Sequence, residues 1–167
     1  MQHLDYEISK PSTIRGYPLH RMVSELTSNE SSLFSDEGNT LLVRTSKTID
    51  APSKPLKKLG VGEISAFELR ACVSVKRKGK HLYFPVNDWR SRHEWLRTKA
   101  TQNGFEILSL HSSQKMTKID DGKRDFRIDQ TDFTGILKVT EGSAFEQALV
   151  KGIGSTGRTF GFGLLII

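Results

Sequence analysis

The sequence predicts an α+β fold with antiparallel sheets, and three observations indicate it. Short apolar runs bounded by turn residues recur along the chain, three other segments carry apolar residues at helical spacing, and the two kinds of segment alternate. Their order is β, α, β, β before residue 60 and β, β, α, β, hairpin, β, α, loop, β after residue 64. This order fits tandem ferredoxin-like (RRM-like) domains, the first abbreviated.

The first predicted domain spans residues 1–60 and contains one helix. From Pro18, which suits a first helical turn, apolar residues follow at i, i+3, i+4 and i+7, namely Leu19, Met22, Val23 and Leu26. Strands are expected over 2–9, at Leu33-Phe34 and over Thr40–Thr45. Residues 50–62 are rich in Pro, Lys and Gly, so we expect a linker there, too short for a second helix.

The second predicted domain spans residues 61–167 and contains two helices. Asp88 is expected to cap a helix that runs to about Asn103 and points inward with Trp89, His93, Leu96 and Ala100. The other helix covers Glu141–Lys151, with Phe145, Ala148 and Leu149 inward. The expected strands are Ile64–Lys76, His81–Val86, Phe105–Leu110, Phe133–Val139 and Phe162–Ile167, with a basic turn at 77–80 and a hairpin over 114–131 around an Asp-Gly pair.

Charge and cysteine content narrow the class of protein. The net charge is +6, and residues 61–167 carry 17 Lys or Arg against 12 Asp or Glu, which favours a polyanionic partner. Cys72 is the only cysteine and its apolar neighbours indicate an inert buried thiol, as in a reducing cytoplasm. The start of the chain has no apolar signal core and no run is long enough to span a membrane, so no membrane partner is expected. The histidines and carboxylates lack metal-ligand spacing, so neither a metal nor another cofactor is expected.

A glycine-rich segment near the C-terminus is the strongest binding signal. Five glycines lie between Gly152 and Gly163, together with the single cation Arg158. Because glycines leave backbone N–H groups uncovered, this loop can approach a phosphate, with Gly154 and Ser155 as the candidate contacts. The spacing matches neither a Walker loop nor a dinucleotide-binding fingerprint. The alternative is a turn of small residues, or a strand that lies close to another backbone.

The first helix carries a cluster of chemically active side chains. His20 and Ser24 are four residues apart, and Tyr17 lies three residues before His20, so all three project from one flank at the helix start. This set suits RNA cleavage by an internal ribose 2′-hydroxyl, with His20 as base or acid and Tyr17 as a hydrogen-bonding group. Arg158 or Lys151 would add positive charge if the C-terminal loop lies beside this helix. The alternative is an inert solvated flank, with Tyr17 as a hydrophobic staple.

Two basic tracts are candidates for RNA binding. The first includes Lys76, Arg77, Lys78, Arg90 and Arg97, and the second includes Lys115, Lys118, Lys123, Arg124 and Arg127. A basic hairpin can follow a phosphate backbone, and arginine can donate two hydrogen bonds to phosphate or guanine. Because the major groove of A-form RNA is deep, contact along the phosphates and at the end of a stem is expected. The alternative is a mixed-charge surface, since Asp120, Asp121 and Asp125 interrupt the second tract.

Two motifs together resemble a known family. Tyr17-Pro18-Leu19-His20 opens the first helix, and Gly152-Ile153-Gly154 leads through Arg158 to Gly161-Phe162-Gly163-Leu164-Leu165. With the strand and hairpin plan between them, the chain resembles the CRISPR repeat-processing endoribonucleases of the CasE type, in the RAMP superfamily. The resemblance covers nearly the whole chain, although this chain is short for the family and its glycine loop is one residue longer than the usual pattern.

The resemblance implies tandem ferredoxin-like domains and metal-independent cleavage at the base of a repeat stem-loop, leaving a 2′,3′-cyclic phosphate or 3′-phosphate and a 5′-hydroxyl. It implies that His20 and Tyr17 are catalytic, and less surely that Arg158 is. It also implies that the enzyme keeps the mature crRNA and joins the other subunits of a Cascade-type complex. Two alternatives remain open: a non-catalytic subunit that caps the crRNA hairpin, and a tandem RNA-recognition module, which would need aromatic stacking motifs that the sequence lacks.

Overall fold

The computed structural model describes residues 2–120, 123 and 125–167. Two four-stranded antiparallel sheets are built from successive parts of the chain, in the orders β2-β3-β1-β4 and β10-β5-β9-β8. Read in the same direction, each sheet runs from the last strand of its unit through the first and third to the second, which is the ferredoxin-like order. The predicted fold class is therefore confirmed. The division of the chain at residue 60 is compatible with the two sheets and stays a prediction.

The first unit has four strands and, among its described residues, one helix. Its elements are β1 (Leu4–Ser9), α1 (Tyr17–Leu26), β2 (Leu33–Asp36), β3 (Thr40–Thr45) and β4 (Ser53–Pro55). Leu19 and Val23 of α1 are buried against Phe34, Leu41 and Val43 of the sheet, as the helical spacing predicts.

The linker expected over 50–62 contains a strand that the sequence analysis missed. Ser53–Pro55 pairs with β1 at the edge of the first sheet, with Tyr6 opposite Ser53 and Leu4 opposite Pro55. All three β4 side chains are exposed. The strand is therefore held by its backbone and leaves no apolar alternation to read, and an edge position tolerates proline.

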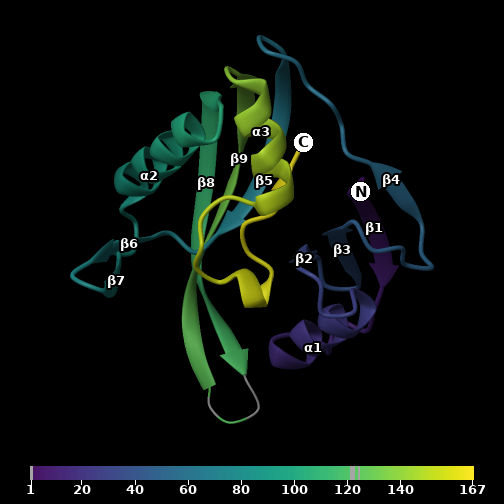
Figure 1. Ribbon diagram of the computed structural model, residues 1–167. Coiled ribbons are helices and arrows are strands. Elements are labelled where there is room, and N and C mark those ends of the chain that lie inside the picture. The colour runs from purple at the N-terminus through teal and green to yellow at the C-terminus, as the bar shows by residue number, and fades with distance from the viewer. Residues whose placement is uncertain (1, 121–122, 124) are drawn as a thin grey trace.

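The second unit is a complete ferredoxin-like domain with an inserted hairpin. Its elements are β5 (Ile64–Ala71), β6 (Ser74–Arg77), β7 (Lys80–Tyr83), α2 (Trp89–Gln102), β8 (Phe105–Asp120), β9 (Asp125–Val139), α3 (Gly142–Lys151), the 3₁₀ turn η1 (Arg158–Phe160) and β10 (Leu165–Ile166). Figure 1 shows β8 and β9 as one long hairpin that extends beyond the rest of the sheet. The Asp-Gly pair expected at its turn lies outside the described residues.

Several predicted strands differ from the structure: β7 ends at Tyr83 rather than Val86, and β8 and β9 extend through the predicted hairpin. The run expected over Ile64–Lys76 breaks at Cys72–Val73 into β5 and β6, because β5 pairs with β9 while β6 leaves the sheet to pair with β7. The strand expected over Phe162–Ile167 is reduced to Leu165–Ile166, because Arg158–Phe160 turns before it and positive φ angles at Gly161 and Gly163 interrupt an extended path.

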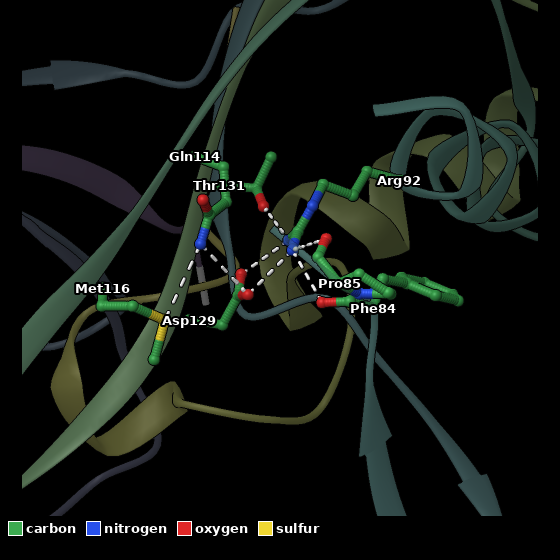
Figure 2. A network of polar contacts seen from close by, with 7 residues as sticks. All are labelled: Phe84, Pro85, Arg92, Gln114, Met116, Asp129 and Thr131. Atoms are coloured by element: carbon green, nitrogen blue, oxygen red, sulfur yellow. Dashed lines mark hydrogen bonds and ion pairs between the residues drawn. The ribbon is translucent and has the colours of Figure 1, made fainter. Parts of the chain in front are cut away.

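The inward face of α2 also differs from the prediction. Asp88 caps the helix, accepting a hydrogen bond from the Ser91 backbone N–H, but Trp89 is 55% exposed and Arg92 is buried. Arg92 forms a bidentate ion pair with Asp129 of β9, at 2.6 and 2.9 Å, and donates to Thr131. It also donates to the carbonyls of Phe84 and Pro85, which follow β7 (Figure 2). A cation is tolerated on this inner face because Asp129 balances its charge and both Nη nitrogens donate hydrogen bonds, although the buried Nε has no hydrogen-bond partner among the described residues.

Another buried arginine joins the two units. Arg44 of β3 pairs with Asp5 of β1, with Nε and Nη2 at 2.7 and 2.9 Å from the two carboxylate oxygens. Its Nη1 donates to the carbonyls of Leu149 in α3 and Leu165 in β10, which belong to the second unit. One buried side chain therefore fixes the first sheet against the C-terminal helix and strand.

We predict that Arg44→Met destabilises the protein by about 3–5 kcal/mol, because it leaves the Asp5 charge buried without its partner. The measurement is urea unfolding followed by circular dichroism, with exposed Arg15→Met as the matched control. A loss no larger than that of the control would contradict a role for Arg44 in holding the two units together.

Candidate active site

The chemically active flank of α1 borders a hollow of about 250 Å³. His20 and Ser24 line it from α1, and Arg158 and Thr159 line it from the C-terminal loop. The structure thus places the glycine-rich loop beside the first helix. Tyr17 does not line the hollow, but its ring lies 6.2 Å from the His20 ring, and its side chain is exposed. Three of the four predicted catalytic residues therefore share one hollow, and the fourth lies next to it.

His20 has the accessibility that proton transfer requires. Its side chain is half-buried, and among the described residues no group hydrogen-bonds to its imidazole. Its backbone N–H donates to the Gly16 carbonyl at 3.0 Å, which fixes the first turn of the helix. Gly16 has a positive φ of 64°, a conformation that favours glycine immediately before the helix. The backbone is thus held while both ring nitrogens stay available to a ligand.

Arg158 lines the hollow beside α1, and its side chain hydrogen-bonds to the backbone of its own loop. Its guanidinium donates through Nε and Nη2 to the Gly154 carbonyl and through Nη1 to the Lys151 carbonyl at the end of α3. Burial lowers the pKa of this guanidinium. All three guanidinium nitrogens donate to backbone carbonyls. The Arg158 side chain therefore stabilises the conformation of the loop next to the hollow.

The glycines of the loop make room for side chains. A Cβ atom at Gly152 would lie 2.8 Å from Arg158 Nη1, and one at Gly163 would lie 2.6 Å from Arg158 Nε. A Cβ at Gly161 would lie 3.0 Å from the Phe34 ring, across the boundary between the two units. The glycines that flank Arg158 are thus explained by packing, which the sequence analysis did not foresee. The segment also does not form the strand that it weighed as an alternative.

Gly154 and Ser155 line a second hollow, of about 130 Å³, at another part of the loop. Lys76 of β6 and Lys99 of α2 line it as well. It shares no lining residue with the hollow that contains His20. The candidate catalytic residues and the candidate loop contacts to RNA are therefore separate sites connected by one short loop.

The other candidate RNA-binding residues are exposed on three elements. Lys76, Arg77 and Lys78 lie on the β6–β7 hairpin, Arg90 and Arg97 on α2, and Lys115, Lys118 and Arg127 on the long β8–β9 hairpin. Lys123 is exposed between β8 and β9, and Arg124 lies outside the described residues. Lys118 faces Arg127 across the ladder and pairs with Asp125 at 3.1 Å, and Arg90 covers the Trp89 ring.

Several side chains at these hollows were not predicted from the sequence. Thr159, Asn29 and Ser31 line the first, and Ser74, His81 and Thr156 line the second. Small polar residues in turns carry no periodic signal, and each meets its hollow only through long-range packing. For Ser74 and His81, their positions on either side of the predicted basic turn were the one usable signal.

Cys72 is buried, as predicted. It packs with Ile119, Ile128 and Phe162, where the long hairpin meets the C-terminal loop. Burial raises the pKa of its thiol to about 12, and the nearby Asp129 charge acts in the same direction. The thiol is therefore protonated at neutral pH and is a poor nucleophile.

We predict that Cys72 reacts with an aromatic disulfide reagent much more slowly in the folded protein than in denaturant, because both burial and the raised thiol pKa suppress the thiolate. The rate is measured by release of the coloured thiol at mildly alkaline pH. Ser155→Cys, at an exposed loop position, provides the accessible control. Labelling of Cys72 at the rate of that added cysteine would contradict the prediction.

The sequence identifies the family. The profile of the family described as CRISPR associated protein matches residues 12–167, so the chain belongs to this family. No curated protein matches the sequence. Among the described helices, none is long and apolar enough to cross a membrane.

Several solved structures share the fold over almost the full length of both chains. CRISPR endoribonuclease Cse3 bound to 19-nucleotide RNA has a TM-score of 0.85 and 21% identity, over 99% of this chain and 96% of that one. Cas6e from Escherichia coli K-12 has a TM-score of 0.78 and 22% identity, over 98% and 97%. A chain of a CRISPR RNA-guided surveillance complex has a TM-score of 0.74 and 21% identity, over 98% and 97%.

Proposed function

We propose that the protein is an endoribonuclease that cleaves CRISPR precursor RNA at the base of the repeat stem-loop. It then keeps the mature crRNA within a Cascade-type complex with other subunits. The observation that carries this proposal is the shared hollow of His20, Ser24 and the C-terminal loop. Family membership supports it, as does the shared fold with a Cse3 endoribonuclease that binds RNA and with a chain of an RNA-guided surveillance complex.

The proposed reaction uses the RNA's own nucleophile and no metal. The ribose 2′-oxygen attacks the adjacent phosphorus, the bond from phosphorus to the 5′-oxygen breaks, and a 2′,3′-cyclic phosphate and a 5′-hydroxyl result. One proton leaves the 2′-hydroxyl and one reaches the departing 5′-oxygen. His20 is placed to take the first proton or to supply the second, since no described group occupies its ring nitrogens.

The neighbouring residues support the transition state in different ways. Ser24 lines the same hollow, one helical turn from His20, and its hydroxyl can donate to a phosphate oxygen. The Tyr17 ring, 6.2 Å from the imidazole, can position the RNA or donate a hydrogen bond. We assign Arg158 a positioning role, because its three nitrogens hold the loop carbonyls.

The direct test uses end-labelled stem-loop repeat RNA with the purified protein in excess EDTA. We expect cleavage at one site, blocked by a 2′-deoxy substitution upstream of the scissile phosphate. Tight binding without cleavage of any repeat from the organism's own arrays would instead support the alternative of a non-catalytic cap on the crRNA hairpin.

We predict that His20→Ala lowers the single-turnover cleavage rate by about 10²–10⁴-fold, because general acid–base catalysis contributes this much. RNA affinity should stay nearly unchanged, since the substitution removes no cation from the two basic tracts. His111→Ala, on β8, is the matched control and should cleave at the wild-type rate. Undiminished cleavage by His20→Ala would remove the residue from the reaction.

We predict that Arg158→Lys and Arg158→Met lower cleavage to a similar extent, each by about tenfold or more, because neither side chain reproduces the planar arrangement in which three guanidinium nitrogens donate to the Gly154 and Lys151 carbonyls. Single-turnover rates and melting temperatures are compared, with exposed Lys58→Met as the control. Near-normal cleavage by the lysine variant alone would show instead that positive charge at this position is what the reaction needs.

A further inference from the structure

The second hollow of the glycine loop, lined by Gly154 and Ser155, carries an inference that goes beyond the cleavage site. Side chains from four separate segments meet there: β6, β7, α2 and the loop itself. Its volume of about 130 Å³ suits a small group better than an extended ligand. The hollow borders a larger groove of about 740 Å³ between the β6–β7 hairpin and α2, and the two share Ser74, Lys76, Trp95 and Lys99.

The charged residues of this hollow are of one sign. Lys76, His81 and Lys99 line it, and no described carboxylate does. The Lys99 ammonium lies 5.8 Å from the centre of the Trp95 ring, which also lines the hollow, and this cation–π contact restrains the ammonium. Such a set attracts an anion, whereas the larger groove also contains Glu94.

Hydroxyl groups complete the arrangement. Ser74 Oγ lies 3.0 Å from Thr156 Oγ1 and 3.4 Å from His81 Nδ1, so these three side chains form a chain of polar contacts between the hairpin and the loop. Hydroxyls and imidazole rings can turn their donors toward an acceptor that enters between them. The same contacts tie the β6–β7 hairpin to the loop.

The backbone of the loop adds further donors. Among the described residues, no acceptor pairs with the backbone N–H groups of Gly154, Ser155 and Thr156. Gly154 has a φ of 76°, and a Cβ atom there would lie 3.2 Å from the Trp95 ring. Consecutive unpaired N–H groups next to a glycine with positive φ form the kind of concave site that binds phosphates. Here the packing of Gly154 and its candidate binding role are compatible.

We propose that this hollow binds one backbone phosphate of the RNA, distinct from the phosphate that is cleaved beside His20. This inference rests on the proposed function. His81, Lys99, Ser74 and Thr156 become RNA-binding residues, beside the expected Lys76, Gly154 and Ser155. With a phosphate held on each side, the loop sets the distance along the RNA between an anchored phosphate and the scissile one. The hollow therefore acts as a positioning site for cleavage.

The first experiment replaces single phosphates of the repeat RNA by neutral methylphosphonates and measures the affinity of each RNA. Neutralising one phosphate away from the cleavage site should weaken wild-type binding about tenfold, because it removes charged hydrogen bonds. Lys99→Met and His81→Gln should each bind unmodified RNA more weakly than the wild type does. Their affinity should not fall further when the same phosphate of the RNA is replaced by a methylphosphonate. The slope of log K against log salt concentration should be shallower for Lys99→Met, by the amount that corresponds to about one phosphate contact. Lys54→Met, an equal charge loss on exposed β4, is the matched control. Variants with the wild-type methylphosphonate profile would overturn the proposal.

The second experiment needs no RNA and separates this proposal from the proposed function. Inorganic phosphate is titrated into the protein while the His81 ring signals are followed by NMR. We expect saturable shifts in the wild type and in His20→Ala, and weaker binding in Thr156→Val. No shift at His81 would overturn the anion site. If His81 shifts with phosphate but the variants keep the wild-type methylphosphonate profile, the hollow binds a free anion and the RNA assignment is overturned. If the methylphosphonate affinities and the phosphate titration are both as expected but the RNA is not cleaved, the proposed catalysis is refuted. The proposed phosphate site is then still supported.

Discussion

The geometry of the site depends on how Arg158 fits between two glycines. Its guanidinium lies where Cβ atoms at Gly152 and Gly163 would be, and it donates to the Lys151 and Gly154 carbonyls. The loop therefore folds back on itself at the end of α3 and has one available path. That path brings η1 to α1 and returns the chain to the second sheet at β10. A side chain at Gly152 would collide with the Gly163 carbonyl and the guanidinium, and one at Gly163 would collide with the guanidinium.

The same loop is held from outside by the first unit and by the long hairpin. The Phe34 ring fills the space beside Gly161, and Phe160 packs edge-on against Phe126 of β9. Arg44 fixes the first sheet against α3 and β10, and this holds the first unit in position beside the loop. Figure 1 shows the outcome: the loop lies between the first unit and the β8–β9 hairpin, so neither unit could form this arrangement alone.

Sequence reasoning succeeded where the signal is local. The i, i+4 spacing of His20 and Ser24 fixes their common side on any helix, and the order of elements predicted the ferredoxin-like plan of both units, although without the edge strand β4 of the first. It failed where a residue's environment is formed by residues that are distant in the sequence. An arginine such as Arg92 is typical of a solvated helix face. Its burial is favourable because it pairs with Asp129, which is distant in the sequence. The loop glycines suggested phosphate binding, while Arg158 and Phe34 account for three of them through packing.

The buried Arg92 also bears on how the basic tracts could work. Arg92 lies between Arg90 and Arg97 of the first tract but is neutralised inside the fold, so the surface field there comes from those two exposed residues. Its contacts to the carbonyls after β7 hold the root of the basic β6–β7 hairpin to α2 and β9 (Figure 2). A hairpin anchored at its root loses less conformational entropy when its tip meets a ligand. Removing an ion pair that touches no RNA would therefore weaken RNA binding through the freedom it gives to the hairpin.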